Sequence, residues 1–182
     1  MLRSRPRANS PNTIPRKGRS QLANLLFVIP KLGFVGRAGE SLFMKWITRS
    51  GVKVDRVACP WLIKKFIDPT AEFVFLPHNT DWPAIRDGTV FDVPNCELGH
   101  HGEDVSFNSI LKKYDLTDPA LRLLAEIVRA ADSHPSQPHP AGEGLRWVAH
   151  GFSALGLTDP EILAHEFVVY DALYAECQRR VT

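Results

Sequence analysis

The spacing of apolar residues divides the chain after residue 44 into a short strand-forming part and a longer helical part. Three short runs rich in aromatic and β-branched residues are typical of strands, at residues 45–48, 72–76 and 89–93. Five longer runs repeat apolar residues every three or four positions, which predicts helices over 55–67, 106–113, 119–131, 145–155 and 160–178. This order predicts an α+β fold, predominantly helical with a small early β-sheet.

Local signals indicate where some of these helices begin. The sequence Leu-Thr-Asp-Pro occurs at 116–119 and again at 157–160. In each copy we expect the aspartate to cap a helix and the proline to occupy its first position. Pro60 lies inside the 55–67 pattern, so either that helix bends there or it begins near Cys59 with Pro60 in its first turn.

Residues 1–43 differ from the rest in composition. They carry eight Lys/Arg and one acid, whereas residues 44–182 carry fourteen Lys/Arg and nineteen Asp/Glu. A secretory signal, an organellar transit peptide and an upstream extension with Met44 as the true start are the three alternatives for this basic beginning. We favour the extension, because strand-like sequence begins directly after Met44. We interpret 1–43 as a disordered extension or leader and 44–182 as one domain. We expect a cytoplasmic protein, or an exported one if 1–43 acts as a leader.

Charge and cysteine content exclude several classes of function. A mildly acidic domain does not attract DNA or RNA, so we expect no nucleic acid partner. The three cysteines are widely spaced and form no CxxC pair, which argues against a disulfide framework and fits a reducing compartment. No apolar run approaches the roughly 20 residues of a membrane span. The sequence does not specify an oligomeric state.

The segment Glu-Leu-Gly-His-His-Gly-Glu at 97–103 holds the densest group of metal-ligand side chains. Carboxylates and neutral imidazoles bind divalent transition metals, and the glycines let the backbone turn sharply. Glu97 and His100 have the spacing to act together, whereas His101 points to the other side of an extended backbone. A solvated turn would tolerate the same residues. We expect Glu103 and Asp104 to cap the helix that follows.

Asp132 is a third candidate ligand. It ends an apolar helix, where a negative charge opposes the helix dipole, so we expect a partner such as Arg129, Arg56 or a metal ion. The alternative is exposure in the loop that follows. Asp171, inside the last helix, is better explained by a hydrogen bond between helices.

Cys59 and Arg56 are candidates for other chemistry. If Cys59 lies near a helix start with cationic neighbours, its pKa is lowered and it could serve as a catalytic nucleophile. The alternative is a small buried side chain. Arg56 could bind an anion together with free N–H groups at the helix start, or form a structural ion pair with Glu97 or Asp132. Asp55 is expected to cap the same helix.

Several segments, in order, resemble the ChrB C-terminal domain of bacterial chromate-resistance proteins. They include Lys-Trp-Ile-Thr-Arg from Lys45, Val-Asp-Arg-Val-Ala-Cys-Pro-Trp-Leu-Ile from Val54, Phe-Asp-Val-Pro from Phe91, the 97–103 segment, and Tyr-Asp-Ala-Leu-Tyr from Tyr170. Members of this family are associated with chromate resistance, some with a DNA-binding region and others with a rhodanese-like domain. Neither is recognisable in this sequence, so the resemblance implies a stand-alone domain and argues against direct transcriptional control.

Together these observations lead to one principal hypothesis. The chain is expected to be a domain associated with chromate resistance or oxidative stress that binds a divalent ion, iron, manganese or zinc, through Glu97, His100 and Asp132. An oxyanion such as chromate would bind near Arg56. A thiol-based redox or sulfur-transfer enzyme using Cys59 and a non-catalytic interaction module are the alternatives, and the sequence does not decide whether the protein is an enzyme.

Overall fold

The structure is a computed structural model, and it describes residues 44–182. The interpretation of residues 1–43 as an extension or leader therefore lies outside the described residues. The elements follow in the order β1 (Lys45–Arg49), α1 (Val54–Phe66), β2 (Glu72–Leu76), η1 (Trp82–Ala84), β3 (Thr89–Val90), α2 (Ser106–Lys113), α3 (Pro119–Asp132), α4 (Ala141–Ala154) and α5 (Asp159–Val181). The α+β class is confirmed.

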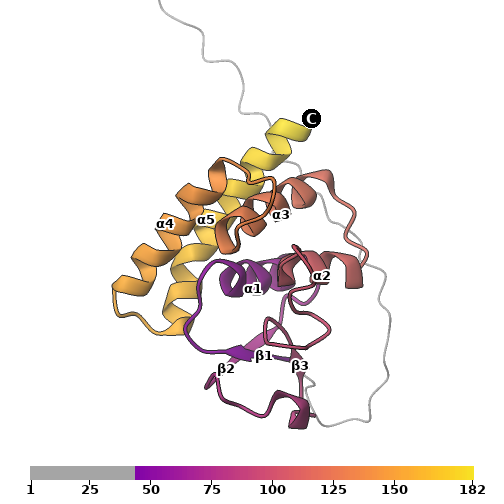
Figure 1. The fold of residues 1–182 in the computed structure, drawn as a ribbon, viewed down its shortest axis with the longest axis vertical. Coiled ribbons are helices and arrows are strands. Elements are labelled where there is room, and N and C mark those ends of the chain that lie inside the picture. Colours follow the sequence, from indigo (N-terminus) through magenta and orange to yellow (C-terminus); the bar gives the residue numbers. More distant parts are fainter. Residues whose placement is uncertain (1–43) are drawn as a thin grey trace, which may run out of the picture. The chain divides into compact units, whose positions relative to one another are not determined.

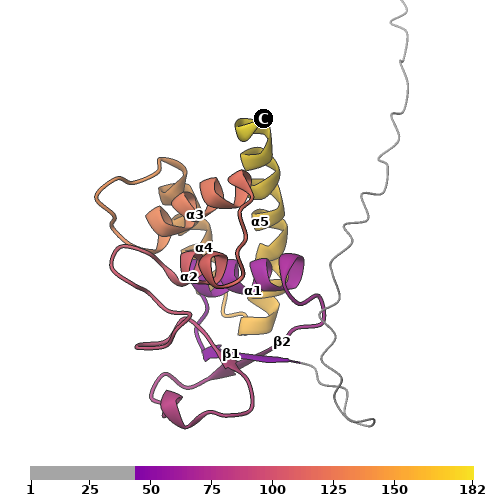
Figure 2. The ribbon, with the colours of Figure 1, turned by 90° about the vertical axis from the view of Figure 1, so that its right-hand side faces the viewer.

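The three strands form one parallel sheet with the order β2-β1-β3. Ile47 pairs with Val74 on one side and with Val90 on the other. The helices lie on one face of this sheet, while the segment between β2 and β3 lies on the other (Figures 1 and 2). Within the sheet, β2 lies along one edge of β1, and the chain then returns past β1 to place β3 along its other edge.

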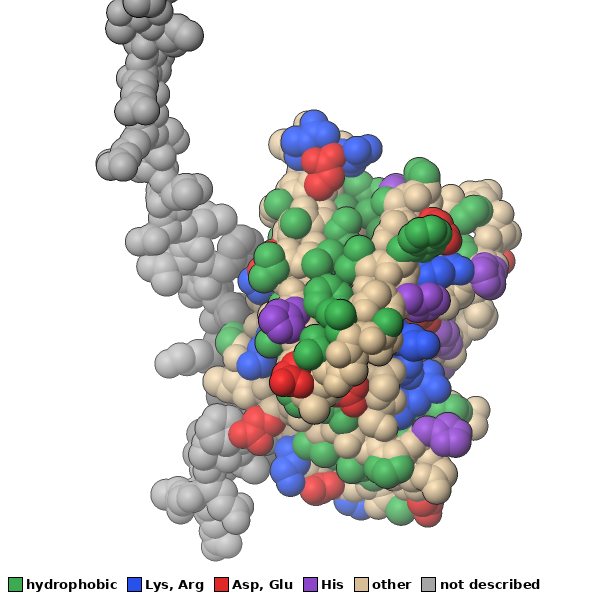
Figure 3. Space-filling model, turned by 90° about the vertical axis from the view of Figure 1, so that its left-hand side faces the viewer, with side chains coloured by type: hydrophobic (Ala, Val, Ile, Leu, Met, Phe, Trp, Pro, Cys, Tyr) green, Lys and Arg blue, Asp and Glu red, His purple; other side chains and the backbone are tan. Residues whose placement is uncertain are grey.

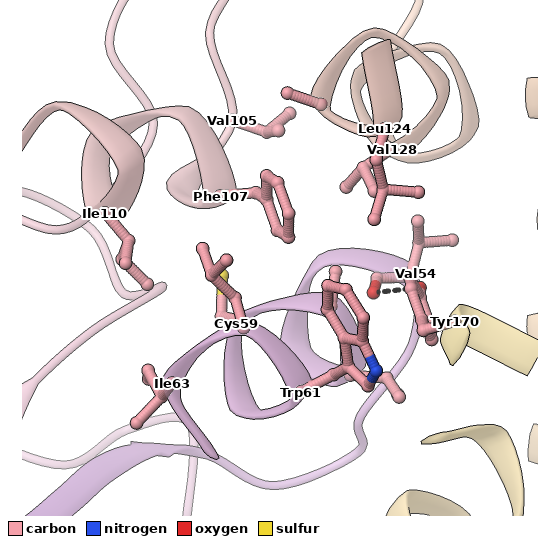
Figure 4. Packing of buried hydrophobic residues seen from close by; sticks show 14 of the residues in the cluster. Val54, Cys59, Trp61, Ile63, Val105, Phe107, Ile110, Leu124, Val128 and Tyr170 are labelled. Atoms are coloured by element: carbon pink, nitrogen blue, oxygen red, sulfur yellow. Dashed lines mark hydrogen bonds between the residues drawn. The ribbon is translucent and has the colours of Figure 1, made fainter. Parts of the chain in front are cut away.

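Helix α1 occupies the centre of the hydrophobic core. It packs against α2, α3 and α5, and Figure 4 shows its side chains facing Phe107 of α2 and Leu124 and Val128 of α3. Tyr170 of α5 donates a 2.7 Å hydrogen bond to the carbonyl of Val54. Asp171 accepts a 2.8 Å hydrogen bond from the Trp61 indole, so the predicted hydrogen bond between helices is confirmed. These apolar contacts and hydrogen bonds hold α1 in position relative to α3 and α5.

The two Leu-Thr-Asp-Pro copies begin helices in different ways. Asp118 caps α3 as predicted, accepting from the N–H of Ala120 at 2.7 Å. At the second copy the prediction was wrong, because Thr158 is the N-cap and forms a capping box with Glu161. Asp159 accepts instead from the N–H groups of Gly51 and Val52, at 3.0 and 2.8 Å. This carboxylate joins α5 to the loop between β1 and α1.

Helix α1 begins at Val54 and continues through Pro60. The alternative in which it starts near Cys59 is therefore wrong, and Cys59 lies in the second turn, away from the free N–H groups of the helix start. A proline here removes one main-chain hydrogen bond of the helix. The residues on both sides of Pro60 within α1 are buried, and their packing against the rest of the domain stabilises the helix despite the lost hydrogen bond.

The outer face of α4 and α5 carries exposed apolar side chains (Figure 3). Trp147, Leu155 and Val168 are 73%, 66% and 68% exposed. The indole of Trp147 donates a 2.6 Å hydrogen bond to Glu143 on the preceding turn. Within residues 44–182, no helix is long and apolar enough to cross a membrane.

Candidate metal centre

Three segments that are far apart in the sequence bring Asp55, His100 and Asp132 together. One ligand atom from each residue lies within 4.8 Å of the others. The Nε2 atom of His100 is 3.4 Å from Oδ2 of Asp55 and 3.5 Å from Oδ2 of Asp132. Ligands about 2.0–2.2 Å from a common ion are themselves about 3–4 Å apart, so small side-chain movements would complete a coordination site.

Asp55 is held in place by the N-terminus of another helix. Its carboxylate accepts hydrogen bonds from the N–H groups of Ser106 and Phe107, at 2.7 and 3.1 Å, and its side chain is only 1% exposed. The prediction that Asp55 caps α1 was therefore wrong, because it lies in the first turn of α1 and caps α2 instead. Glu103 and Asp104 do not cap α2, whose N-cap, Val105, makes no side-chain cap hydrogen bond.

Asp132 is the last residue of α3, and its position explains how a carboxylate is tolerated there. Its Oδ1 atom accepts a long, 3.4 Å hydrogen bond from the N–H of Asp55 at the start of α1. Its Oδ2 atom faces His100, and the side chain is 23% exposed. Asp132 therefore has partners, but neither is the expected Arg129 or Arg56: they are the N–H of Asp55 at the start of α1 and the imidazole of His100.

Asp92 is a third carboxylate around the imidazole. Its Oδ1 atom lies 3.3 Å from Nε2 of His100 and accepts a 2.8 Å hydrogen bond from the Ser106 hydroxyl. Its Oδ2 atom lies 3.5 Å from Nη1 of Arg56. The backbone of Asp92 is left-handed, with φ of 49°, a conformation that few non-glycine residues adopt and that recurs at functional sites. Asp92 thus ties His100 to Arg56.

Burial and mutual repulsion shape the charge of the centre. Loss of hydration and the neighbouring carboxylates Asp55 and Asp92 raise the pKa of Asp132 to about 6. Burial also raises the pKa of Asp55, although His100 opposes this. Hydrogen bonds with Asp55 and Asp92 raise the pKa of His100 to about 10. The cluster therefore attracts positive charge strongly, and either a proton on His100 or a metal ion can supply it.

The structure does not bring Glu97 to this cluster. Its carboxylate pairs with Lys113 at 2.5 Å, and its side chain is 70% exposed. The ring of His101 turns away from the centre, with its Nε2 atom 2.9 Å from the carbonyl of Glu97. The turn around Gly99 directs His100 inward but leaves Glu97 on the surface beside α2. Glu97 and His100, although three residues apart in the sequence, therefore do not belong to the same site.

Cys59 is close to the centre but closed to solvent. It is 0% exposed, and its thiol lies 3.5 Å from Oδ1 of Asp55. Burial, followed by the charge of Asp55, raises the pKa of this thiol well above its ordinary value. The expected lowering of its pKa by a helix start and cationic neighbours was therefore wrong. The geometry does not favour a thiolate nucleophile.

Arg56 lies at the edge of the centre, with a side chain that is 13% exposed. Its ion-pair partner is Asp92, not Glu97 or Asp132 as expected. Within the described residues, Nε and Nη1 of Arg56 are buried without a hydrogen-bond partner. Burial lowers the pKa of this guanidinium, yet arginine stays charged at neutral pH.

Sequence reasoning missed Asp92 and gave Asp55 only a capping role. A signal for both was present: Asp92 lies near the end of the third predicted strand, and Asp55 opens the helix after the first. In parallel sheets, the loops after the carboxyl ends of strands carry binding residues. The sequence did not reveal that the strands are parallel, and so this rule could not be applied.

The comparisons with known proteins agree with the resemblance in the sequence. The family model described as the C-terminal domain of ChrB matches residues 46–177. The chain is 34% identical over 131 residues to Protein ChrB of Cupriavidus metallidurans, covering 71% of this chain and 40% of that protein. It thus spans about two fifths of that relative. No solved structure matches the chain. The chain therefore belongs to the ChrB C-terminal domain family.

Proposed function

We propose that the domain binds a divalent metal ion through Asp55, His100 and Asp132. The observation that carries the proposal is the convergence of these three ligand atoms within 4.8 Å from the start of α1, the 97–103 turn and the end of α3. His100 is 44% exposed, so an ion and an exchangeable ligand can reach the centre from solvent. Asp92 would hold His100 and Arg56 in position, as residues beyond the ligands of metal sites commonly do.

The ligand set favours particular metals. Carboxylate oxygens outnumber the single imidazole, and the nearest sulfur, that of Cys59, is protonated and faces Asp55. Such a set suits manganese, ferrous iron or zinc better than copper, which prefers more nitrogen or sulfur ligands. A negatively charged, partly buried centre retains a divalent cation more strongly than an exposed acidic patch does.

The proposal is tested by calorimetric titration of the full chain with Mn²⁺, Zn²⁺ and, without oxygen, Fe²⁺. We expect one ion per chain, with affinity reduced at least tenfold in His100→Ala. His101→Ala is the matched control, because the neighbouring ring faces away from the cluster, and it should bind as the unmodified protein does. Equal affinities for both variants and the unmodified protein would exclude this centre as the metal site.

A second pair of variants separates Asp132, which belongs to the cluster, from Glu97, which the sequence predicted as a ligand but which lies outside the cluster. Asp132→Asn should weaken binding, since its carboxylate faces His100. Glu97→Gln should not, because Glu97 pairs with Lys113 on the surface. If Glu97→Gln weakens binding while Asp132→Asn does not, the ligand set inferred from the geometry is incorrect.

We also propose that the domain acts in chromate resistance and that an oxyanion such as chromate binds near the ion. Family membership supports the first part. For the second, Arg56 supplies positive charge. Because it pairs with Asp92 and is only slightly exposed, we expect it to attract the anion electrostatically from a distance, without touching it. An anion that touches the protein directly would need another cationic side chain.

A further inference from the structure

A small pocket lies beside the proposed metal centre, at the carboxyl ends of β1 and β3. It has a volume of about 190 Å³ and is lined by Arg49, Asp92, Val93, Pro94, Asn95 and His100. The chain passes from β1 to β2 on one side and returns to place β3 on the other. Open parallel sheets bind ligands at this kind of reversal, outside the carboxyl ends of the strands.

Arg49 is the one cationic side chain lining this pocket apart from the imidazole. It is the last residue of β1, which directs it to the carboxyl edge of the sheet. Within residues 44–182, its guanidinium has no ion-pair partner, and its Nε is buried without a hydrogen-bond partner. It also lies near enough to Arg56 to lower the pKa of that side chain. Of these two neighbouring arginines, Arg56 pairs with Asp92, whereas Arg49 lines the pocket without an ion-pair partner among the described residues.

The charges of the centre explain what this second arginine does. With a divalent ion bound and His100 neutral, the ion and the carboxylates of Asp55, Asp92 and Asp132 leave one net negative charge. Arg56 alone would cancel it. Arg49 makes the loaded centre positive by one charge, which attracts an anion into the adjoining pocket.

We infer that Arg49 and this pocket form a subsite for a small carboxylate or oxyanion, which binds beside the metal ion. The inference rests on the proposed metal site. The recognised chemistry is a single carboxylate or tetrahedral oxyanion group, because a guanidinium offers paired N–H donors to either. The small volume admits such a group with few further atoms, and Val93 and Pro94 provide an apolar wall.

The subsite is tested with the full chain loaded with Co²⁺, whose visible absorption reports changes at the ion. Co²⁺ loading is first measured for each variant. Acetate and sulfate are then titrated separately at constant ionic strength. Either anion, or both, should change the Co²⁺ spectrum saturably, and Arg49→Gln should weaken that response at least tenfold. A response to acetate alone assigns the subsite to carboxylates, and one to sulfate alone assigns it to tetrahedral anions.

Controls separate this inference from the metal proposal. Arg122→Gln removes an exposed arginine of α3 outside the pocket and should respond as the unmodified protein does. Arg49→Lys, which keeps the charge without the paired donors, should fall between Arg49→Gln and the unmodified protein, even if the glutamine variant folds poorly. Failure of Co²⁺ to bind would overturn the metal site. Binding of Co²⁺ with no anion response, or a response that both Arg49 variants retain in full, would overturn the anion subsite alone.

Discussion

Asp55 serves two elements with one buried carboxylate. It completes the N-terminus of α2 and also faces His100. The sequence placed Asp55 correctly at the start of α1 but assigned its cap to that helix, because capping rules relate residues a few positions apart. Its actual partner, Ser106, is 51 residues away. Such a contact depends on how helices pack, and no local pattern encodes it.

At the same scale, Cys59 should resist alkylation while the protein is folded. The thiol is fully buried and its pKa is raised, so neither access nor thiolate is available. We expect iodoacetamide to modify the partly exposed Cys96 faster at pH 7.5, and Cys59 only after addition of denaturant. Mass spectrometry of the digested protein measures both rates. Rapid modification of native Cys59 would instead favour the thiol-enzyme alternative.

Glu166 should make stability depend on pH. It is 0% exposed, its oxygens have no hydrogen-bond partner within the described residues, and burial raises its pKa from 4.5 to about 7. Folding therefore favours its protonated form, so its contribution is complete below pH 4.5 and is lost as the pH rises to about 7.

Glu166→Met should remove this dependence. Relative to the unmodified protein, its free energy of unfolding should rise by about 3 kcal/mol between pH 4.5 and pH 7.5. Urea denaturation at several pH values measures the difference, and Glu126→Gln on the exposed side of α3 is the control. A difference that stays constant with pH would mean that Glu166 ionises normally in the folded protein.

At the scale of elements, apolar periodicity predicted most of the helices well. The bounds of α2 match the prediction, and α3 and α5 differ by a few residues at their ends. The strands were also located, although β3 has only Thr89 and Val90. The direction of pairing was not predictable, because these strands are too short to separate the continuous apolar pattern of parallel strands from the alternating pattern of antiparallel ones. The site depends on that direction.

Asp159 provides a test at this scale. Its carboxylate accepts from two N–H groups of the loop between β1 and α1, linking that loop to the start of α5. Asp159→Ala should lower the free energy of unfolding by about 1–3 kcal/mol, because both donors lose their partner. Thermal or urea unfolding measures the loss, again with Glu126→Gln as control. An unchanged stability would show that water replaces the carboxylate at no cost.

At the scale of the whole molecule, the centre joins segments that are distant in the sequence. Asp55 comes from α1 and accepts hydrogen bonds from α2, His100 comes from the turn after β3, and Asp132 comes from the end of α3. An ion bound to all three can bind only when these parts are assembled. Metal binding should therefore stabilise the folded domain as a unit.

This linkage predicts the size of the effect. With free Mn²⁺ at a hundred times its dissociation constant, the free energy of unfolding should rise by about 2.7 kcal/mol. Urea denaturation with Mn²⁺ and with chelator measures the change, which should disappear in His100→Ala and persist in His101→Ala. If all three proteins show the same gain, Mn²⁺ binds elsewhere on the chain.

The most direct test of the central claim is anomalous diffraction from crystals of the full chain soaked with Mn²⁺. The account predicts one strong peak, about 2.0–2.2 Å from Nε2 of His100 and from a carboxylate oxygen of Asp55 and of Asp132. A fully loaded crystal with its peak at other residues, and with His100 still hydrogen-bonded to the three aspartates, would contradict it.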